Sequence, residues 1–280
     1  MTLPAQRPPG SRDLLPGAGR RTVALLDVDP DLGAGMTQER FAMARHEVRT
    51  CPLTLRRGEW SAGEFGSLNC SNVGSLVLDG ILAREILFEN TISTELLGPG
   101  DFIRPWSDEE PCLLRQRVRW QVLAKARMAV FDTSFVSALR RYPELSAALT
   151  DRALARSQRL ATTQAISHLN SVERRLCALL WHMAERWGRV TGDGIVVPLT
   201  LSHRLLGELI GARRPTVSTA LAALERQGKV RRREDATWLL TGEPPGTPAE
   251  QVCRVVSHRR RLLSHQAPPA LSLVDGRRTV

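Results

Sequence analysis

Aromatic residues, lysines and long apolar runs are all scarce in this sequence of 280 residues. Phe, Trp and Tyr make up 5% of the chain, with a single tyrosine, and only two of the 39 basic residues are lysines. No apolar run approaches the roughly 20 residues that a membrane-spanning helix needs. The N-terminal segment also lacks the apolar centre of a secretory signal. We therefore expect a cytoplasmic protein that does not associate with a membrane.

Closely spaced cysteines are also absent. No two of the five cysteines lie within five residues of each other, so there is no C-x-x-C metal signature, and an odd, scattered set does not indicate a disulfide framework. Buried, inert thiols are the favoured interpretation, and convergence of distant cysteines on a metal is the alternative. We expect no metal and no cofactor. The five residues are Cys51, Cys70, Cys112, Cys177 and Cys253.

Catalytic motifs are missing as well. The sequence has no phosphate-binding loop, no G-x-S-x-G nucleophile elbow and no H-E-x-x-H motif. The acidic run Asp108-Glu109-Glu110 is typical of a charged loop. We expect that the protein is not an enzyme.

Positive charge is what the sequence has in excess. The formal net charge is +10, which favours polyanionic partners such as nucleic acid or an anionic membrane surface. An arginine-rich composition without a specific partner is the alternative at this point. The positions of the basic residues in the sequence have to decide between a polyanionic partner and a merely arginine-rich composition.

Residues 47–133 show the pattern of several strands separated by turns. Val118, Trp120 and Val122 alternate with polar residues, which is the two-residue period of a half-buried strand. Several such strands favour a sandwich or jelly roll. The flanking segments 1–26 and 243–280 have too few large apolar residues to build a core and are expected to be disordered.

Helical periods begin after residue 131. A long helix is expected over 143–169, starting at Pro143, and a second follows it to Gly188. A further helix begins at a plausible N-cap, Ser202, and ends at Gly211. A last helix then runs from Arg214 to Gln227, before two short strands around Glu234-Asp235-Ala236.

This helix–turn–helix followed by a β-hairpin is typical of a DNA-binding unit. Val217, Leu221 and Leu224 share one face of the last helix and must point to the core, which leaves the opposite face outward. Arg214 on that face can donate two hydrogen bonds to one guanine. The expected base-reading residues are Arg214, Ser218 and Thr219. The expected phosphate contacts are Ser202, His203, Arg204, Arg213, Thr216, Arg231, Arg232 and Arg233.

Three stretches resemble the Crp/Fnr family of bacterial transcription regulators. They are LLGPGDFI at 96–103, VLAKARMAVFDTSFVSALRRYPEL at 122–145 and LSHRLLGELIGARRPTVSTALAALERQGKV at 201–230. The resemblance covers roughly residues 40–242. It implies an α+β fold, with an N-terminal β jelly roll like a cyclic-nucleotide-binding domain, a long dimerisation helix and a C-terminal winged helix-turn-helix. The implied function is regulation of transcription by a homodimer on a near-palindromic operator in double-stranded DNA.

The resemblance also sets the expected divisions of the chain and its further partners. RNA polymerase and an unknown small-molecule effector are the additional partners that it suggests. The divisions are a disordered arm (1–26), a β-roll sensor domain (27–142), a dimerisation helix (143–169), a winged helix-turn-helix domain (170–242) and a flexible basic tail (243–280).

The β-domain departs from the family pattern for cyclic nucleotides. Those binders follow the Gly-Asp turn with Gly-Glu for the ribose and later present Arg followed by Ser or Thr and Ala for the phosphate. Here Ile103 is followed by Arg104-Pro105-Trp106, and no Arg-Ser-Ala equivalent is present. We expect a degenerate or non-cAMP pocket, for which cAMP is not a strong ligand. The candidate pocket residues are Arg104, Trp106, Arg117 and Arg119.

A ligand-sensing or protein-interaction module with weak or lost DNA binding is the alternative function. Against it, residues 199–242 contain eight basic and four acidic residues, a net charge of +4. The turn chemistry of the helix–turn–helix is also intact. Both features favour DNA binding.

Overall fold

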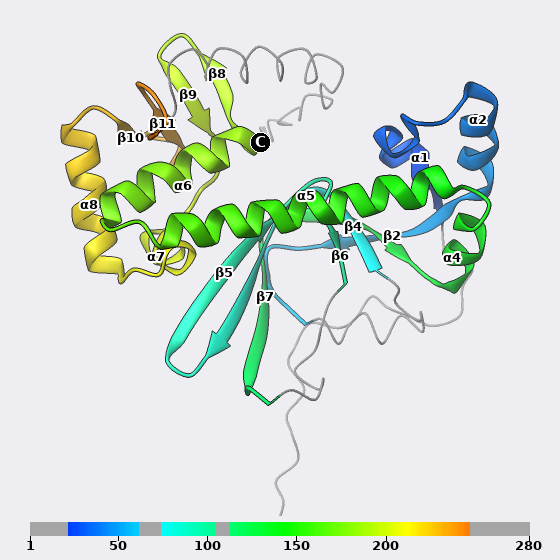
Figure 1. Cartoon of the computed structure of the whole chain (residues 1–280), viewed down its shortest axis with the longest axis horizontal. Coiled ribbons are helices and arrows are strands. Elements are labelled where there is room, and N and C mark those ends of the chain that lie inside the picture. Colours follow the sequence, from blue (N-terminus) through cyan, green and yellow to red (C-terminus); the bar gives the residue numbers. More distant parts are fainter. Residues whose placement is uncertain (1–21, 62–73, 105–112, 247–280) are drawn as a thin grey trace, which may run out of the picture. The chain divides into compact units, whose positions relative to one another are not determined.

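The computed structural model describes residues 22–61, 74–104 and 113–246. The chain divides into two compact units between Ala165 and Ile166, and each unit contains its own antiparallel sheet (Figure 1). Most of the expected N-terminal arm and of the expected C-terminal tail, and Trp106 of the candidate pocket, lie outside the described residues.

The first unit is built on a seven-stranded antiparallel sheet. Its main path is β1-β2-β7-β4-β5, while β3 pairs with β7 and β6 pairs with β4. This arrangement confirms the expected antiparallel β-domain. The strands are β1 (Val23–Ala24), β2 (Arg49–Leu55), β3 (Gly58–Trp60), β4 (Gly74–Phe88), β5 (Thr91–Leu97), β6 (Phe102–Ile103) and β7 (Gln116–Phe131).

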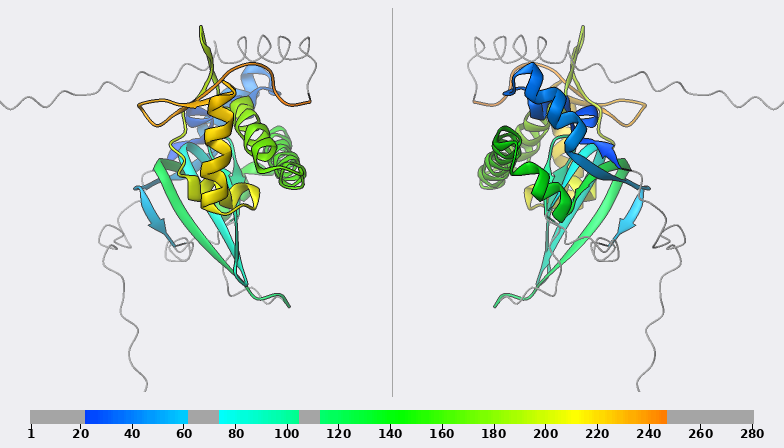
Figure 2. Two further views of the ribbon diagram at one scale, coloured as in Figure 1. Left: turned by 90° about the vertical axis from the view of Figure 1, so that its left-hand side faces the viewer. Right: turned by 90° about the vertical axis from the view of Figure 1, so that its right-hand side faces the viewer.

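The two longest strands, β4 and β7, pair along almost their whole length and extend with β5 beyond the rest of the sheet (Figure 2). Their register shifts between Val77 and Leu82. Gly80 lies in this irregular stretch with φ of +83°, and a Cβ there would lie 2.4 Å from the Lys125 carbonyl oxygen. A bulge at a glycine lets a strand bend without ending. For this reason β4 continues as a single strand of 15 residues, paired with the 16 residues of β7.

One core of this unit follows the predicted alternation on β7. Trp120 and Val122 are buried, whereas Arg117 and Arg119 are exposed. The ring of Trp120 meets that of Trp60 edge-on, with centroids 5.5 Å apart, an arrangement that aromatic pairs prefer. The core residues are Leu55, Trp60, Val77, Leu82, Leu97, Ile103, Trp120, Val122, Ala126, Met128 and Val130.

A second core forms where short helices meet the other end of the sheet. Stacked rings of Phe131 and Phe135 lie within it, with centroids 3.9 Å apart. The helices around it are α1 (Leu25–Val28), a 3-10 turn η1 (Pro30–Gly33), α2 (Gln38–Glu47), α4 (Thr133–Leu139) and the start of α5 (Pro143–Ser167).

The first residues that the structure describes differ from the sequence expectation. Residues 1–26 were expected to be a disordered arm, yet Val23 and Ala24 pair with β2, and Leu25 and Leu26 are buried in the second core. The run Val-Ala-Leu-Leu at 23–26 is apolar enough to pack, although the average composition of the first 26 residues is not.

The helix α5 is attached to the sheet by a row of arginines at i, i+4 and i+7, which share one helix face. Arg152 pairs with Asp29 at 3.5 Å, Arg156 pairs with Glu95 of β5 at 2.7 Å, and Arg159 pairs with the fully buried Asp101. Away from this arginine face, α5 exposes Leu154 by 57% and Leu160 by 38%, on two different sides of the helix. The helix therefore presents one ionic face to its own sheet and keeps apolar side chains free.

Over its described residues, the second unit contains three helices and a four-stranded sheet of order β10-β11-β9-β8. The side chains of Leu176, Leu206, Val217 and Trp238 are each at most 2% exposed and form its interior. The elements are α6 (Val172–Trp187), β8 (Arg189–Thr191), β9 (Gly194–Val197), α7 (His203–Ile210), α8 (Arg214–Arg226), β10 (Val230–Arg232) and β11 (Trp238–Leu240). The predicted helix ends agree with these bounds to within two residues.

Among the residues that the structure describes, no helix combines the length and the apolar character needed to cross a membrane. The same residues hold no group of three or more His, Cys, Asp or Glu side chains suited to a metal ion.

Candidate nucleic-acid interface

The first helix of the candidate interface, α7, is defined at both ends by the expected residues. The hydroxyl of Ser202 accepts a hydrogen bond from the Leu205 N–H at 3.2 Å, which is N-capping. Gly211 closes the helix in the left-handed conformation, with φ of +67°. Ser202 therefore has a structural role in addition to the predicted phosphate contact.

The turn between α7 and α8 lies close against α7. The N–H of Ala212 donates to the Gly207 carbonyl at 2.9 Å. A Cβ on Gly207 would lie 2.4 Å from the carbonyl oxygen of Ala212. Glycine at this position lets the turn approach the helix and sets the direction in which α8 leaves it.

Substitution of Gly207 by alanine is expected to lower the free energy of unfolding of the second unit by about 1–3 kcal/mol. The new methyl group meets a backbone oxygen, which cannot rotate away, so the turn has to shift. Thermal unfolding measures the loss. Gly192→Ala is the matched control, because a Cβ at Gly192 has no atom within 4 Å, and an equal loss in both variants would contradict the explanation.

The second helix, α8, is anchored by one face and open on the other. Val217, Leu221 and Leu224 are buried, as the spacing predicted, while Arg214 and Thr219 are exposed. Pro215 lies in the first turn, where its missing N–H has no helical partner to lose. The exposed first turn is thus held by a buried rear face.

The hydroxyl groups on the open face of α8 are both engaged with the helix backbone. Ser218 Oγ donates to the Arg214 carbonyl at 3.1 Å, and Thr219 Oγ1 donates to the Pro215 carbonyl at 3.2 Å. Ser218 has a second partner, because His203 Nδ1 lies 2.9 Å from its Oγ. Ser218 is half-buried, and this hydrogen bond connects it to α7.

His203 lies where α7, α8 and the β-hairpin meet. Its ring centroid is 6.5 Å from that of Trp238 on β11. Burial lowers the pKa of His203, and the charges of Arg232 and Arg214 lower that pKa further. His203 is predicted from the sequence to contact phosphate, and its hydrogen bond to Ser218 is an additional feature of the structure.

The predicted β-hairpin after α8 is present as β10 and β11. The carboxylate of Asp235 holds its turn, accepting from the Thr237 N–H at 3.0 Å. Arg232 lies with its guanidinium 5.6 Å from the Trp238 ring centroid, and Arg233 is 3.9 Å from Asp235. All three wing arginines, Arg231, Arg232 and Arg233, are exposed, and the charge of Arg232 acts on His203.

The remaining phosphate candidates lie at the starts of the two helices. Arg213 is the N-cap residue of α8 and is exposed, as is Thr216. Arg204 is exposed by 64% along its side chain but pairs with Glu208 at 2.7 Å. A contact from Arg204 to phosphate therefore competes with that ion pair.

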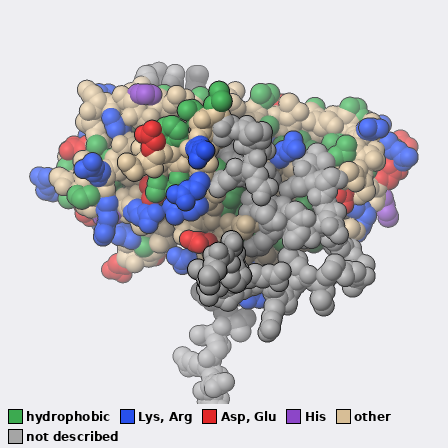
Figure 3. All heavy atoms as spheres, turned by 90° about the horizontal axis from the view of Figure 1, so that it is seen from below, with side chains coloured by type: hydrophobic (Ala, Val, Ile, Leu, Met, Phe, Trp, Pro, Cys, Tyr) green, Lys and Arg blue, Asp and Glu red, His purple; other side chains and the backbone are tan. Residues whose placement is uncertain are grey.

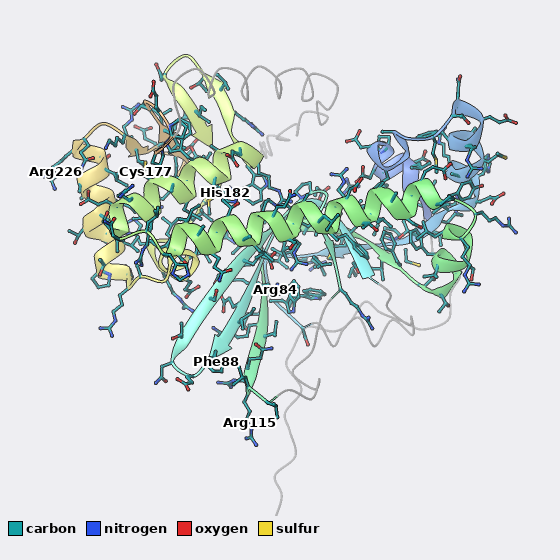
Figure 4. The ribbon with its side chains drawn as sticks, viewed as in Figure 1. Arg84, Phe88, Arg115, Cys177, His182 and Arg226 are labelled. Atoms are coloured by element: carbon teal, nitrogen blue, oxygen red, sulfur yellow. The ribbon has the colours of Figure 1, made fainter. Side chains whose placement is uncertain are left out.

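The candidate effector residues that the structure describes belong to the first unit. Arg104 and Arg117 are exposed, and Arg119 pairs with Glu85 at 2.7 Å. The buried arginine of the sheet is instead Arg84 on β4, labelled in Figure 4, whose guanidinium is 5.9 Å from the Trp120 ring centroid. From a sequence alone, a charged residue inside a strand is expected on the surface. The burial of Arg84 was therefore not predicted.

Arg84 belongs to a buried ionic triad with Glu95 and Arg156. Arg84 Nη2 lies 2.6 Å from Glu95 Oε2, and Arg156 donates to both oxygens of Glu95 at 2.7 and 2.9 Å. Burial lowers the pKa of Arg84. Burial acts in the same direction on Arg156, but the hydrogen bonds and charge of Glu95 outweigh it and raise the pKa of Arg156. The triad fixes α5 to β4 and β5.

An antiparallel β-domain, a long helix and a winged helix-turn-helix with an exposed recognition helix together define a class of DNA-binding regulator. Residues 174–241 match the family model of the Crp-like helix-turn-helix domain. The regulatory protein CysR of Synechococcus elongatus is 31% identical over 150 residues, which cover 52% of this chain and 64% of that protein. The alignment thus spans just under two thirds of the length of CysR.

Two solved structures share the fold of this chain over more than its helix-turn-helix domain. A CooA mutant from Carboxydothermus hydrogenoformans has a TM-score of 0.54 and 17% identity, covering 75% of this chain and 87% of that one. FixK2 from Bradyrhizobium japonicum has a TM-score of 0.52 and 16% identity, covering 79% and 99%. Residues 174–241 therefore carry a Crp-like helix-turn-helix domain, as the resemblance of residues 201–230 indicated, and the chain is similar to regulators of the Crp/Fnr family.

Proposed function

We propose that the protein is a sequence-specific transcription regulator that binds a near-palindromic DNA operator as a homodimer. The observation that carries the proposal is the recognition helix α8, whose first turn is exposed at Arg214 while Val217, Leu221 and Leu224 hold its rear face. A helix of 13 residues is about 20 Å long, which suits a major groove.

The base-reading and phosphate-contacting residues are proposed as the sequence analysis named them. Arg214 would read a guanine through two hydrogen bonds, a discrimination of about 1–3 kcal/mol. Arg213, Thr216 and Arg231 are exposed around the same helix start and wing, where phosphates would be met. Lys and Arg side chains are visible on the face seen in Figure 3. Such positive side chains can bind the phosphates of a nucleic acid.

The homodimer is proposed to form through α5. The helix has 25 residues and exposes Leu154 and Leu160, the only large apolar side chains left open on it among the described residues. Burial of these two side chains against a second copy would remove them from water. Two recognition helices related by a two-fold axis would then meet successive major grooves one helical turn apart.

Regulation by an effector is proposed to differ from that of a cyclic-nucleotide binder. The guanidinium groups of Arg84 and Arg156 are already bound by Glu95, so a cyclic phosphate would have to displace a carboxylate to reach them. An effector of another kind, and RNA polymerase as a protein partner, are part of the proposal.

Selection from a random duplex library, followed by binding titrations, tests the proposed function. We expect an enriched sequence with two-fold symmetry and half-site centres about 10 base pairs apart, or a multiple of that spacing. Binding to it is expected to exceed binding to random duplex by at least about 10³-fold at physiological salt. Equal affinity for both duplexes would favour the alternative, a sensing or interaction module with weak or lost DNA binding.

A further inference from the structure

At the candidate interface, a chain of three hydrogen-bonding groups runs across α7 and α8. It runs from His203 Nδ1 to Ser218 Oγ at 2.9 Å and from Ser218 Oγ to the Arg214 carbonyl at 3.1 Å. It connects the first turn of one helix to the outward face of the next. Its middle member is a predicted base-reading residue.

The direction of each bond follows from the number of protons. A carbonyl oxygen only accepts, so the single hydroxyl proton of Ser218 is donated to Arg214. His203 Nδ1 must then carry a proton and donate it to Ser218 Oγ. The hydroxyl has no proton left to donate outward, and its remaining lone pair can only accept.

Two of the elements packed around His203 bring positive charge to its ring. Arg214 on α8 and Arg232 on β10 both place positive charge near the ring. On α7 itself, Arg204 is paired with Glu208, and the neighbour from β11 is the uncharged ring of Trp238. In the free protein these surroundings favour a neutral imidazole with its proton on Nδ1.

We propose that His203 is a positioning residue that fixes the Ser218 hydroxyl as a hydrogen-bond acceptor toward DNA, and that its Nε2 takes up a proton when the operator binds. The inference rests on the proposed function. An acceptor at Ser218 matches an amino group in the major groove, adenine N6 or cytosine N4, and does not match the acceptors of guanine or thymine.

Proton uptake follows from the charges that DNA brings. Burial is the largest cause of the low pKa of His203, and the charges of Arg232 and Arg214 lower that pKa further. Phosphates near these two arginines offset the contribution of their charges, so we expect a higher pKa of His203 in the complex than in the free protein. The complex then binds more protons than the free protein over the interval between the two pKa values. Operator affinity therefore rises as pH falls through the pKa of the complex and levels off below the pKa of the free protein.

The experiment is a titration of the selected operator at constant ionic strength from pH 5.5 to 8.5, read by fluorescence anisotropy, on the full-length chain. The wild-type affinity is expected to rise by several-fold, with a slope of at most about tenfold per pH unit. His203→Asn keeps an N–H donor for Ser218 and does not titrate, so it should keep the preference for adenine or cytosine at the base facing Ser218 and lose the slope.

Two further variants separate positioning from charge. His203→Ala removes the donor, and we expect it to lose the slope and also to relax the preference for adenine or cytosine at the base facing Ser218. Ser218→Ala should relax the same preference while keeping the pH slope. His182→Gln is the control, because His182 lies on α6, pairs with Glu185 at 3.2 Å and should leave slope and preference unchanged.

Each outcome separates this inference from the proposed function. If His203→Asn keeps the wild-type slope, or if Ser218→Ala keeps the wild-type base preference, the inference is wrong while operator binding stands. If the wild-type chain does not distinguish the operator from random duplex at any pH, the proposed function itself fails.

Discussion

Replacement of Glu95 by glutamine is expected to lower the free energy of unfolding of the first unit by about 3–5 kcal/mol. Glutamine has nearly the same shape, so the change removes charge and little else. It leaves the guanidinium groups of Arg84 and Arg156, whose side chains are only 8% and 18% exposed, without the carboxylate that both of them bind. Two like charges in a poorly hydrated place then repel each other, a penalty far larger than one lost hydrogen bond.

Denaturant unfolding of the full chain measures this loss, with Glu47→Gln as the matched control. Glu47 pairs with Arg141 at 3.2 Å, but the two side chains are 42% and 74% exposed, so its substitution should change stability by no more than about 1 kcal/mol. A triple variant, Arg84→Met with Glu95→Leu and Arg156→Met, removes all three charges and should recover much of the loss. If Glu95→Gln costs no more than Glu47→Gln, the triad does not hold α5 to the sheet.

The helix–turn–helix could be predicted from the sequence because its signals are local. The capping hydroxyl of Ser202, the left-handed Gly211 and the i, i+4, i+7 spacing of Val217, Leu221 and Leu224 all lie within 23 residues and act on their own helices. The alternation on β7 is local in the same way. Such patterns follow from backbone geometry alone.

The interactions that the sequence did not indicate all join residues on different elements. Ser218 meets His203, 15 residues earlier on another helix, and Arg156 meets Glu95, 61 residues earlier on a strand. A charged or polar residue in a sequence is usually on the surface, so burial of Arg84 and Glu95 requires knowledge of the fold. The ordered segment at Leu25 and Leu26 was missed for the same reason, since its partners are distant in sequence.

Replacement of Arg214 by alanine is expected to weaken operator binding by about 5- to 150-fold, equivalent to 1–3 kcal/mol. Its position in the first turn of α8, exposed beside a buried rear face, suits a bidentate contact with one guanine. Binding to random duplex should fall much less, because that binding depends on phosphates alone. Parallel titrations of both duplexes at one salt concentration measure the two losses.

Two control variants decide which property of Arg214 matters. Arg214→Lys keeps the charge but loses the planar fork of donors, so it should lose operator affinity almost as alanine does while keeping affinity for random duplex. Arg226→Ala removes an exposed arginine at the far end of α8, labelled in Figure 4, and should affect both duplexes slightly and equally. Equal losses on both duplexes for Arg214→Ala, together with wild-type behaviour of Arg214→Lys, would make Arg214 a phosphate contact and assign base reading to the other residues of α8.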